Sequence, residues 1–366
     1  MERPLVSIVI AAYNTPDYTR KTLKSIVEQV YRPIEVVVSD DHSSISLKPI
    51  VEEFACFEDD LFSIRYHWQQ VNLGGSDNQT FCFDQAAGKY VVQMPHDDWF
   101  TDERFLAEAI EIMENSPECY LCVANSELEN ANGFKMVKLP KSIDAKDKWC
   151  ILEGDAYINL LGMDRIGHQA WSGIVCNAPA ARSLGVFHYP FPMTRSQGEA
   201  LGIMPDEGFA FQFLLSSIGS VALTEKVVSV RGRPPTSFCE SRGEEWARVV
   251  GQAMFVIHYS LYKAKLTGKY AAAVKKRARE TIFHYPVDRM NWRILRHYHY
   301  APDAIWLMSL SYAKGWKGHV RRYPAHYVSL LRHFFQAAER GELSSLVAKH
   351  KARGVRGVFA TLLPSR

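Results

Sequence analysis

Strand-like and helix-like patterns alternate along the first hundred residues of the chain. Short apolar runs predict four buried strands, at residues 5–10, 34–38, 62–68 and 90–94. Between them, apolar side chains recur at helical spacing in residues 17–29, 49–57 and 78–87. Repeated strand–helix units of this kind favour an α/β fold with a doubly wound, mostly parallel sheet and right-handed crossovers.

Beyond residue 100 the pattern is less regular. It predicts helices at residues 102–114, 154–161 and 209–217, and strands at residues 120–125 and 221–230. Most of residues 127–170 read as loop. The basic segment 231–237, rich in Gly and Pro, is the best domain boundary. We therefore expect a domain at residues 1–230, a linker at 231–244 and a helical region at 245–366, with helices at 246–265, 271–283, 302–312 and 325–340.

Charge divides the chain into two unlike parts. Residues 245–366 carry 22 Lys and Arg against 6 Asp and Glu, whereas the first 244 residues carry 21 against 34. Basic helices that also contain aromatic residues suit an anionic membrane surface. The alternative is a helical domain packed on the first, with a solvated basic face. Nucleic-acid binding would also explain the charge, but no RNA- or DNA-binding motif accompanies it.

The composition indicates an intracellular protein. No run of 18 uncharged apolar residues predicts a membrane-spanning helix, and the N-terminus lacks the features of a signal peptide. Seven cysteines at irregular spacing fit free thiols in a reducing cytoplasm better than a disulfide framework. Cys119 and Cys122 form a lone CxxC, which we interpret as strand thiols rather than as a metal or redox site. We expect a cytoplasmic protein whose basic region contacts the inner face of the membrane.

Two pairs of carboxylates follow two of the predicted strands. Asp40 and Asp41 follow the strand at 34–38, and Asp97 and Asp98 follow the strand that Pro95 ends. The carboxyl ends of parallel strands meet at one edge of a sheet, where open α/β folds bind ligands. Because adjacent like charges need a cation or a hydrogen-bonding ligand, the pattern indicates a hard divalent cation and a diphosphate. The alternative is that each pair caps the helix that follows.

A third acidic pair, Asp206 and Glu207, precedes the helix predicted at 209–217. It is either an N-cap or the source of a general base. The turn after the first strand has no GxGxxG, and no GxxxxGK[ST] loop occurs in the chain. Their absence argues against a dinucleotide-binding dehydrogenase and against a P-loop enzyme.

Taken in order, these motifs resemble the family 2 glycosyltransferases of the GT-A fold. Residues 4–14 resemble the opening strand and its Tyr-Asn turn, and residues 34–43 resemble the strand that ends in the uracil-reading Asp. Residues 72–76 resemble the Asn-x-Gly loop, and residues 87–98 resemble the block Ala-Gly-Glu-Tyr…Asp-x-Asp. The resemblance covers residues 4–230, and the order of the motifs makes it more specific than any one of them.

The resemblance implies a role for each matching position. Contacts with the nucleotide sugar would come from Ala12, Tyr13, Asn14, Asp40, Asp41, Asn72, Gly74, Gly75 and Asp97. Asp98 would be the main ligand of Mg²⁺ or Mn²⁺, with Asp97 beside it. Asp206 or Glu207 would be the base of an inverting displacement, and the spacing to Gly219 favours Glu207. Trp171 is either a stacking platform for the acceptor or a core residue.

Some positions depart from the family pattern. His96 stands where the first Asp of Asp-x-Asp is common, Gln79-Thr80 replaces the usual Arg-Asn, and the helix Arg is replaced near Gln212. The resemblance still implies an inverting, metal-dependent glycosyltransferase that uses a nucleotide-diphosphate sugar, with UDP favoured. Its acceptor would be a glycan or a lipid-linked glycan in surface polysaccharide biosynthesis. The alternatives are a catalytically silent binding protein and a nucleotidyltransferase, although the first turn lacks the Gly-rich basic loop of the latter.

Overall fold

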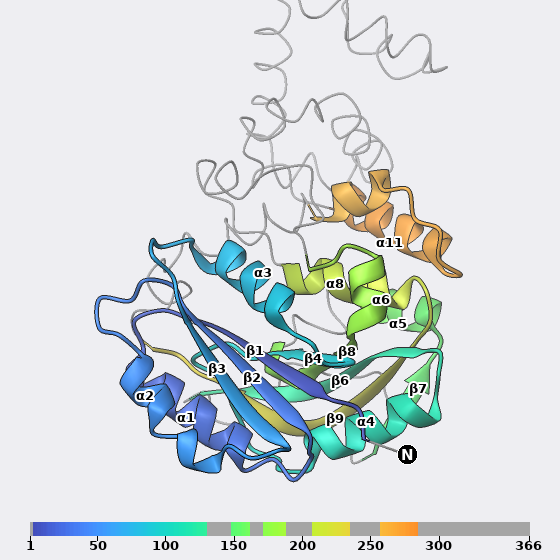
Figure 1. Ribbon diagram of the computed structural model, residues 1–366. Helices are drawn as coiled ribbons and strands as arrows, with labels where there is room; N and C mark the ends of the chain where they lie inside the picture. The colour runs from blue at the N-terminus through green and yellow to red at the C-terminus, as the bar shows by residue number, and fades with distance from the viewer. Residues whose placement is uncertain (1–2, 130–147, 162–170, 188–206, 235–256, 285–366) are drawn as a thin grey trace, which may run out of the picture. The chain divides into compact units, whose positions relative to one another are not determined.

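In a computed structural model of the chain, nine strands of the described residues form one sheet between two layers of helices (Figure 1). The described residues are 3–129, 148–161, 171–187, 207–234 and 257–284. The order in the sheet is β3-β2-β1-β4-β8-β6-β9-β5, with β7 paired to β9. The strands are β1 Val6–Ala12, β2 Ile34–Asp40, β3 Phe62–Trp68, β4 Tyr90–Gln93, β5 Trp99–Phe100, β6 Cys119–Leu128, β7 Cys150–Leu152, β8 Ile174–Asn177 and β9 Ser220–Arg231.

The first half of the sheet has the predicted parallel pattern. β3, β2, β1 and β4 pair in parallel, and Ala12 at the end of β1 lies opposite Asp40 at the end of β2. The second half is mixed, because β8 inserts antiparallel between β4 and β6, while β6 and β9 pair in parallel. The predicted α/β class is confirmed. The short strands β5, β7 and β8 were not predicted, because two to four residues are too few to show a period.

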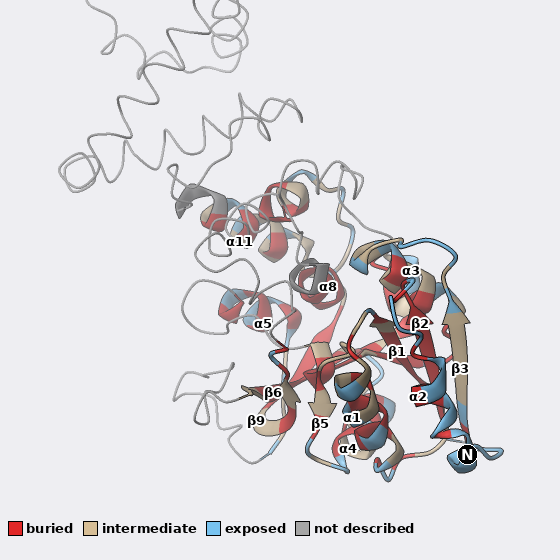
Figure 2. Ribbon diagram, turned by 90° about the vertical axis from the view of Figure 1, so that its left-hand side faces the viewer, coloured by how far each residue is buried: buried red, intermediate tan, exposed pale blue. Residues whose placement is uncertain are grey.

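Helices cover both faces of the sheet. In Figure 1, α1, α2 and α4 lie below the sheet, and α3, α5, α6 and α8 lie above it. The helices are α1 Pro16–Val27, α2 Lys48–Glu52, α3 Gly75–Gln85, α4 Phe105–Asn115, α5 Gly154–Leu160, α6 Ala178–Ser183, α8 Glu207–Ser216 and α11 Ala271–His284, with short 3₁₀ turns η1 Ala55–Phe57 and η2 Trp171–Gly173. This coverage explains why successive β1 residues such as Ile8 and Val9 are both buried (Figure 2).

The compact unit extends beyond the predicted linker. Internal contacts divide the chain into Met1–Thr281 and Ile282–Arg366. Tyr270 donates its backbone N–H to Ser217 O at 2.7 Å, and Arg277 Nε donates to Leu161 O at 2.9 Å. Residues of α11 therefore belong to the first unit. The helices predicted at 302–312 and 325–340 lie outside the described residues, as does most of the helix predicted at 246–265.

The buried carboxylate of Glu35, near the amino ends of the parallel strands, explains why Ala87 and Gly88 precede β4. Glu35 Oε1 accepts hydrogen bonds from Ser7 Oγ at 2.5 Å and from the Ala87 N–H at 2.6 Å. Its Oε2 pairs with Arg65 Nη2 at 2.7 Å. The Gly88 N–H donates to Ser7 Oγ at 2.7 Å. A Cβ on Gly88 would lie only 2.7 Å from the Ser7 backbone nitrogen, so the turn needs a residue without a side chain.

We predict that Gly88→Ala lowers the free energy of unfolding by about 1–3 kcal/mol, since the added methyl group overpacks the backbone of β1. The control is Gly75→Ala at the start of α3, where a Cβ meets no atom within 4 Å. That change should raise stability by up to about 1 kcal/mol through the unfolded state. Urea unfolding of both variants measures this; equal effects of the two changes would contradict the packing argument.

Candidate active site

The first two acidic pairs lie at the same edge of the sheet, on either side of β1. Asp40 ends β2, which is the neighbour of β1 on one side. Asp97 and Asp98 follow β4, the neighbour on the other side. The Met94 N–H still donates to Val9 O at 2.9 Å, so the chain leaves the ladder just before the second pair. The proximity predicted from the sequence is thus what the topology produces.

Asp40 has a structural role. Its fully buried carboxylate accepts the Ser43 N–H at 3.0 Å on Oδ1, and the Leu47 N–H at 2.9 Å and the Tyr66 hydroxyl at 2.8 Å on Oδ2. Burial, with Asp40 as a further cause, raises the pKa of Tyr66, so this phenol stays a donor. Asp40 therefore fixes the loop after β2, and a nucleotide contact from its carboxylate remains only a prediction.

Asp41 bonds two other predicted contact positions, Ala12 and Asn72, and also Leu73. Its N–H donates to Ala12 O at 2.9 Å, its Oδ1 accepts the Leu73 N–H at 2.6 Å, and its carbonyl accepts Asn72 Nδ2 at 3.0 Å. Tyr13, next to Ala12, is 46% exposed and presents its ring to solvent. Residues distant in sequence therefore meet at the carboxyl end of β1.

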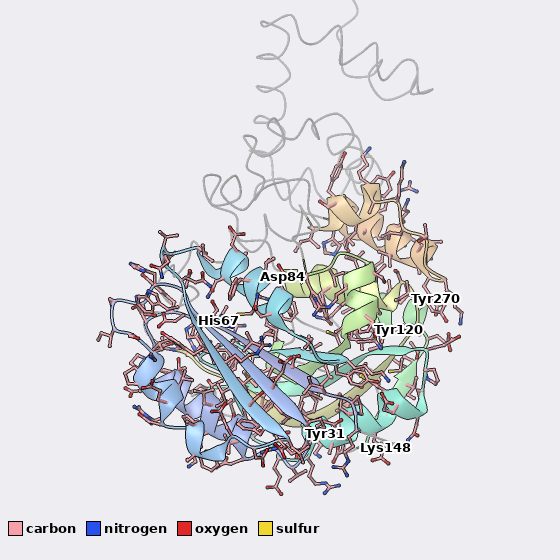
Figure 3. All side chains as sticks on the ribbon, viewed as in Figure 1. Tyr31, His67, Asp84, Tyr120, Lys148 and Tyr270 are labelled. Carbon is pink, nitrogen blue, oxygen red and sulfur yellow. The ribbon has the colours of Figure 1, made fainter. Side chains whose placement is uncertain are left out.

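The loops around this point adopt backbone conformations that place polar groups along the edge. Asn14 has φ of 54°, and its Oδ1 accepts the Ser44 N–H at 2.7 Å. Gly74 has φ of 78°, a value that favours glycine, and it precedes the first turn of α3 at Gly75. Figure 3 shows His67 of β3 on the side of the sheet that α3 covers, and its ring lies 5.1 Å from that of Phe81. The start of α3 thus borders the Asp41 loop.

Asp98 is the most strongly perturbed carboxylate of the site. Only 2% of it is exposed, its Oδ2 accepts the Ser172 hydroxyl at 2.9 Å, and its Oδ1 accepts the Gly232 N–H at 3.2 Å. Burial, followed by the charge of Asp97, raises the pKa of Asp98 to about 8. Asp97 is only partly buried. A carboxylate desolvated in this way, beside a second one that reaches solvent, suits a cation.

Side chains missed by sequence reasoning support Asp98. Ser172 Oγ lies 3.0 Å from Ser229 Oγ, which lies 2.7 Å from Ser126 Oγ, and all three hydroxyls are buried. Gly232 packs so closely that a Cβ would lie 1.9 Å from Asp97 O. The first residues of the predicted linker therefore form part of the acidic corner. Serine and glycine carry no sequence signal of their own for such a role, although Ser172 adjoins the predicted Trp171.

The oxygen donors fit a divalent cation that is shared with a ligand. Within the described ranges, no group of three or more His, Cys, Asp and Glu side chains is arranged to hold a metal. Mg²⁺ and similar cations are often held by one or two carboxylates together with substrate phosphates. Asp97 and Asp98 fit that pattern. Asp97 reaches solvent, whereas each Asp98 oxygen accepts one protein hydrogen bond and keeps a second lone pair, so the metal contact of Asp98 that the sequence favours stays a prediction.

The base candidates lie at the start of α8. Glu207 is the first residue of the helix, and Asp206 lies outside the described residues. This position is compatible with both an N-cap and a general base. Further along α8, buried Gln212 accepts the Tyr157 hydroxyl at 2.5 Å, so this replacement has a packing role. Trp171 is half-buried, and its ring meets Phe211 edge-on at 5.4 Å, so a core role and a stacking role both remain compatible with its place.

The sheet order and its acidic edge are those of a GT-A fold. Two solved structures share the fold: Staphylococcus aureus TarS 1–349 in complex with UDP-GlcNAc (14% identity, TM-score 0.54, 93% of this chain and 89% of that chain) and the mannosyltransferase PcManGT of Pyrobaculum calidifontis in complex with GDP-Man and Mn²⁺ (14%, 0.53, 95% and 86%). Residues 7–171 match Glycosyl transferase family 2, so this part of the chain is identified as a domain of that family.

Curated relatives match a shorter segment. An uncharacterised protein of Mycobacterium tuberculosis, Rv1520, is 29% identical over 136 residues (37% of this chain, 39% of the relative). The GalNAc(5)-diNAcBac-PP-undecaprenol beta-1,3-glucosyltransferase of Campylobacter jejuni is 31% identical over 96 residues (26% and 30%). The chain thus spans less than two fifths of the length of these relatives. In the part of the chain that is described, no helix is both long and apolar enough to cross a membrane.

We predict that Ser172→Ala lowers the free energy of unfolding by about 1–3 kcal/mol, because it leaves a buried carboxylate oxygen without its donor. The control is Ser183→Ala, where an exposed hydroxyl bonds only Ala180 O within α6. That change should stay within about 0.5 kcal/mol. In an Asp98→Asn background the cost of Ser172→Ala should shrink; an unchanged cost in this double-mutant cycle would contradict the assigned contact.

Proposed function

We propose that the chain is an inverting, metal-dependent glycosyltransferase. It moves a sugar from a nucleotide-diphosphate sugar to a hydroxyl group of a glycan or a lipid-linked acceptor, in surface polysaccharide biosynthesis. The proposal rests mainly on one observation: two groups of acidic residues lie on opposite sides of β1. The Asp41 loop lies on one side, and the buried Asp98 with Asp97 lies on the other. The complexes of TarS with UDP-GlcNAc and of PcManGT with GDP-Man and Mn²⁺ support a nucleotide-sugar donor.

The donor nucleotide binds at the Asp41 loop. Asp41 accepts a hydrogen bond from the ring N–H of the base, which favours uracil, and the exposed Tyr13 ring packs against the base. Asp41 is held for this task by Ala12, Leu73 and Asn72. The start of α3 at Gly75, where a Cβ would meet open space, leaves room for the diphosphate to approach the backbone.

The acidic corner binds the cation that accompanies the diphosphate. Asp97, which reaches solvent, would hold the cation, and the buried Asp98 would add a second carboxylate. When bound, Mg²⁺ or Mn²⁺ stabilises the charge that develops on the leaving diphosphate. The protein holds these carboxylates rigidly through Ser172 and Gly232, so little reorganisation is needed.

The acceptor hydroxyl is deprotonated at the start of α8. Glu207, or Asp206 before it, takes the proton while the acceptor oxygen attacks the anomeric carbon. The C–O bond to the diphosphate breaks in the same displacement, which inverts the anomeric configuration. Trp171 lies close to Ser172, and hence to the acidic corner, and its ring offers a face for the acceptor sugar.

We predict that a panel of UDP-, GDP-, TDP- and CDP-sugars gives release of nucleoside diphosphate with one donor class, UDP by preference, and that EDTA abolishes it. Asp97→Asn should remove nearly all activity. Of Glu207→Gln and Asp206→Asn, the variant that lacks the base should lose about 10²–10⁴ in rate. The control is Asp17→Asn, an exposed carboxylate on α1. Metal-independent turnover, or full turnover in Asp97→Asn, would reject the proposal.

The same panel separates the two alternatives. A catalytically silent binding protein would bind a nucleotide sugar without releasing nucleoside diphosphate. A nucleotidyltransferase would instead consume a nucleoside triphosphate and a sugar phosphate and release pyrophosphate. The departure at Gln79 is one reason to test for a catalytically silent binding protein. Its Nε2 is buried without a hydrogen-bond partner.

We further propose that the C-terminal region holds the enzyme on the inner face of the cytoplasmic membrane, where a lipid-linked acceptor is found. Residues 282–366 carry 14 Lys and Arg against 4 Asp and Glu. The full chain should bind vesicles that contain anionic lipid at physiological salt, and a variant ending at Thr281, the last residue of the first unit, should not. Equal binding of the two proteins in a sedimentation assay would rule out this role.

A further inference from the structure

His96 stands at the centre of the acidic edge with its imidazole held in one orientation. Its Nδ1 lies 3.0 Å from the backbone oxygen of Ala11 in β1. A carbonyl oxygen only accepts hydrogen bonds, so Nδ1 carries the proton. In the neutral ring, Nε2 therefore carries the lone pair.

That second nitrogen has access to solvent. His67 has a buried Nε2 without a hydrogen-bond partner, and His96 does not share this feature. The His96 ring contacts Ala11 O through Nδ1, and the residue is partly exposed. Among the residues that the structure describes, nothing occupies Nε2, so it is open to an external ligand.

The backbone around His96 is fixed on both sides of Asp97. Thr22 Oγ1 of α1 lies 3.0 Å from His96 O and 2.6 Å from Asp98 O. Asp98 is also held by Ser172 and Gly232. His96 and Asp97 are thus adjacent, partly exposed residues on a clamped turn, which is the rigidity that a metal ligand needs.

We propose that His96 Nε2 is a ligand of the divalent cation beside Asp97, so that the site prefers Mn²⁺ to Mg²⁺. The inference rests on the proposed function, which supplies the cation. A ligating histidine usually donates its other ring N–H to a carbonyl or carboxylate, as Nδ1 does here. Imidazole suits the transition metals, whereas Mg²⁺ prefers oxygen donors. If the His96 ring served only to donate a hydrogen bond to Ala11 O in place of a backbone N–H, its second nitrogen would not need to be accessible.

The test is pulsed electron paramagnetic resonance of Mn²⁺ bound to the full chain with UDP. Protein labelled with ¹⁵N-histidine should show a hyperfine coupling from a directly bonded nitrogen. His96→Asn should abolish it, because asparagine keeps a donor near the Nδ1 position for Ala11 O but has no equivalent of Nε2. The control is His42→Asn: His42 also bonds a carbonyl through Nδ1, and its positive φ of 60° suits asparagine. This variant should keep the coupling.

Metal affinity gives a second measurement. In calorimetric titrations of the full chain with UDP present, His96→Asn should weaken Mn²⁺ binding about 10-fold or more and change Mg²⁺ binding by less than about 3-fold. Absence of the nitrogen coupling in the native protein, or its persistence in His96→Asn, overturns the inference. If transfer still requires Mn²⁺ in that event, the proposed function stands. If Mn²⁺ and UDP do not bind at all, the proposed function falls with it.

Discussion

The burial of the Asp98 carboxylate is the constraint on which the candidate site depends. It joins four parts of the chain: the exit from β4, the η2 turn through Ser172, the end of β9 through Gly232, and α1 through Thr22. Its hydrogen-bond donors are neutral, and the charge of Arg231 also lowers the pKa of Asp98, but burial and the charge of Asp97 raise that pKa by more. Glu35 at the opposite edge is also buried, and it forms a direct ion pair with Arg65. The two carboxylates differ in this respect: Glu35 pairs directly with a cation, and the pKa of Asp98 stays raised.

The parallel half of the fold could be predicted because β1 and β2 are buried almost throughout and read as apolar runs. The edge strand β3 is only partly buried, and it has the predicted bounds of Phe62–Trp68. The antiparallel insertion of β8 could not be predicted. It is four residues long, and its partners β4 and β6 lie far away in the sequence.

The site shows the same division. Carboxylates at strand ends are visible in a sequence, because a hydrophobic run stops and charge begins. The hydrogen-bond donors to these carboxylates cannot be predicted from the sequence. Ser172 and Gly232 lie 74 and 134 residues from Asp98, and a serine or a glycine in a sequence does not indicate what it will bond. Resemblance alone assigns Asp40 to the nucleotide, and that contact stays a prediction, whereas the structure shows that its oxygens accept hydrogen bonds from Ser43, Leu47 and Tyr66. Resemblance locates an acidic position, and only the hydrogen bonds show whether its charge faces a ligand.

Gly232 connects the end of β9 directly to the acidic corner. The segment that leaves the sheet donates a hydrogen bond to Asp98 within one residue of the end of β9. A Cβ on Gly232 would lie 1.9 Å from Asp97 O, so the same residue also limits where the backbone of Asp97 can lie. A displacement of the chain at the end of β9 would therefore move both carboxylates of the acidic corner together.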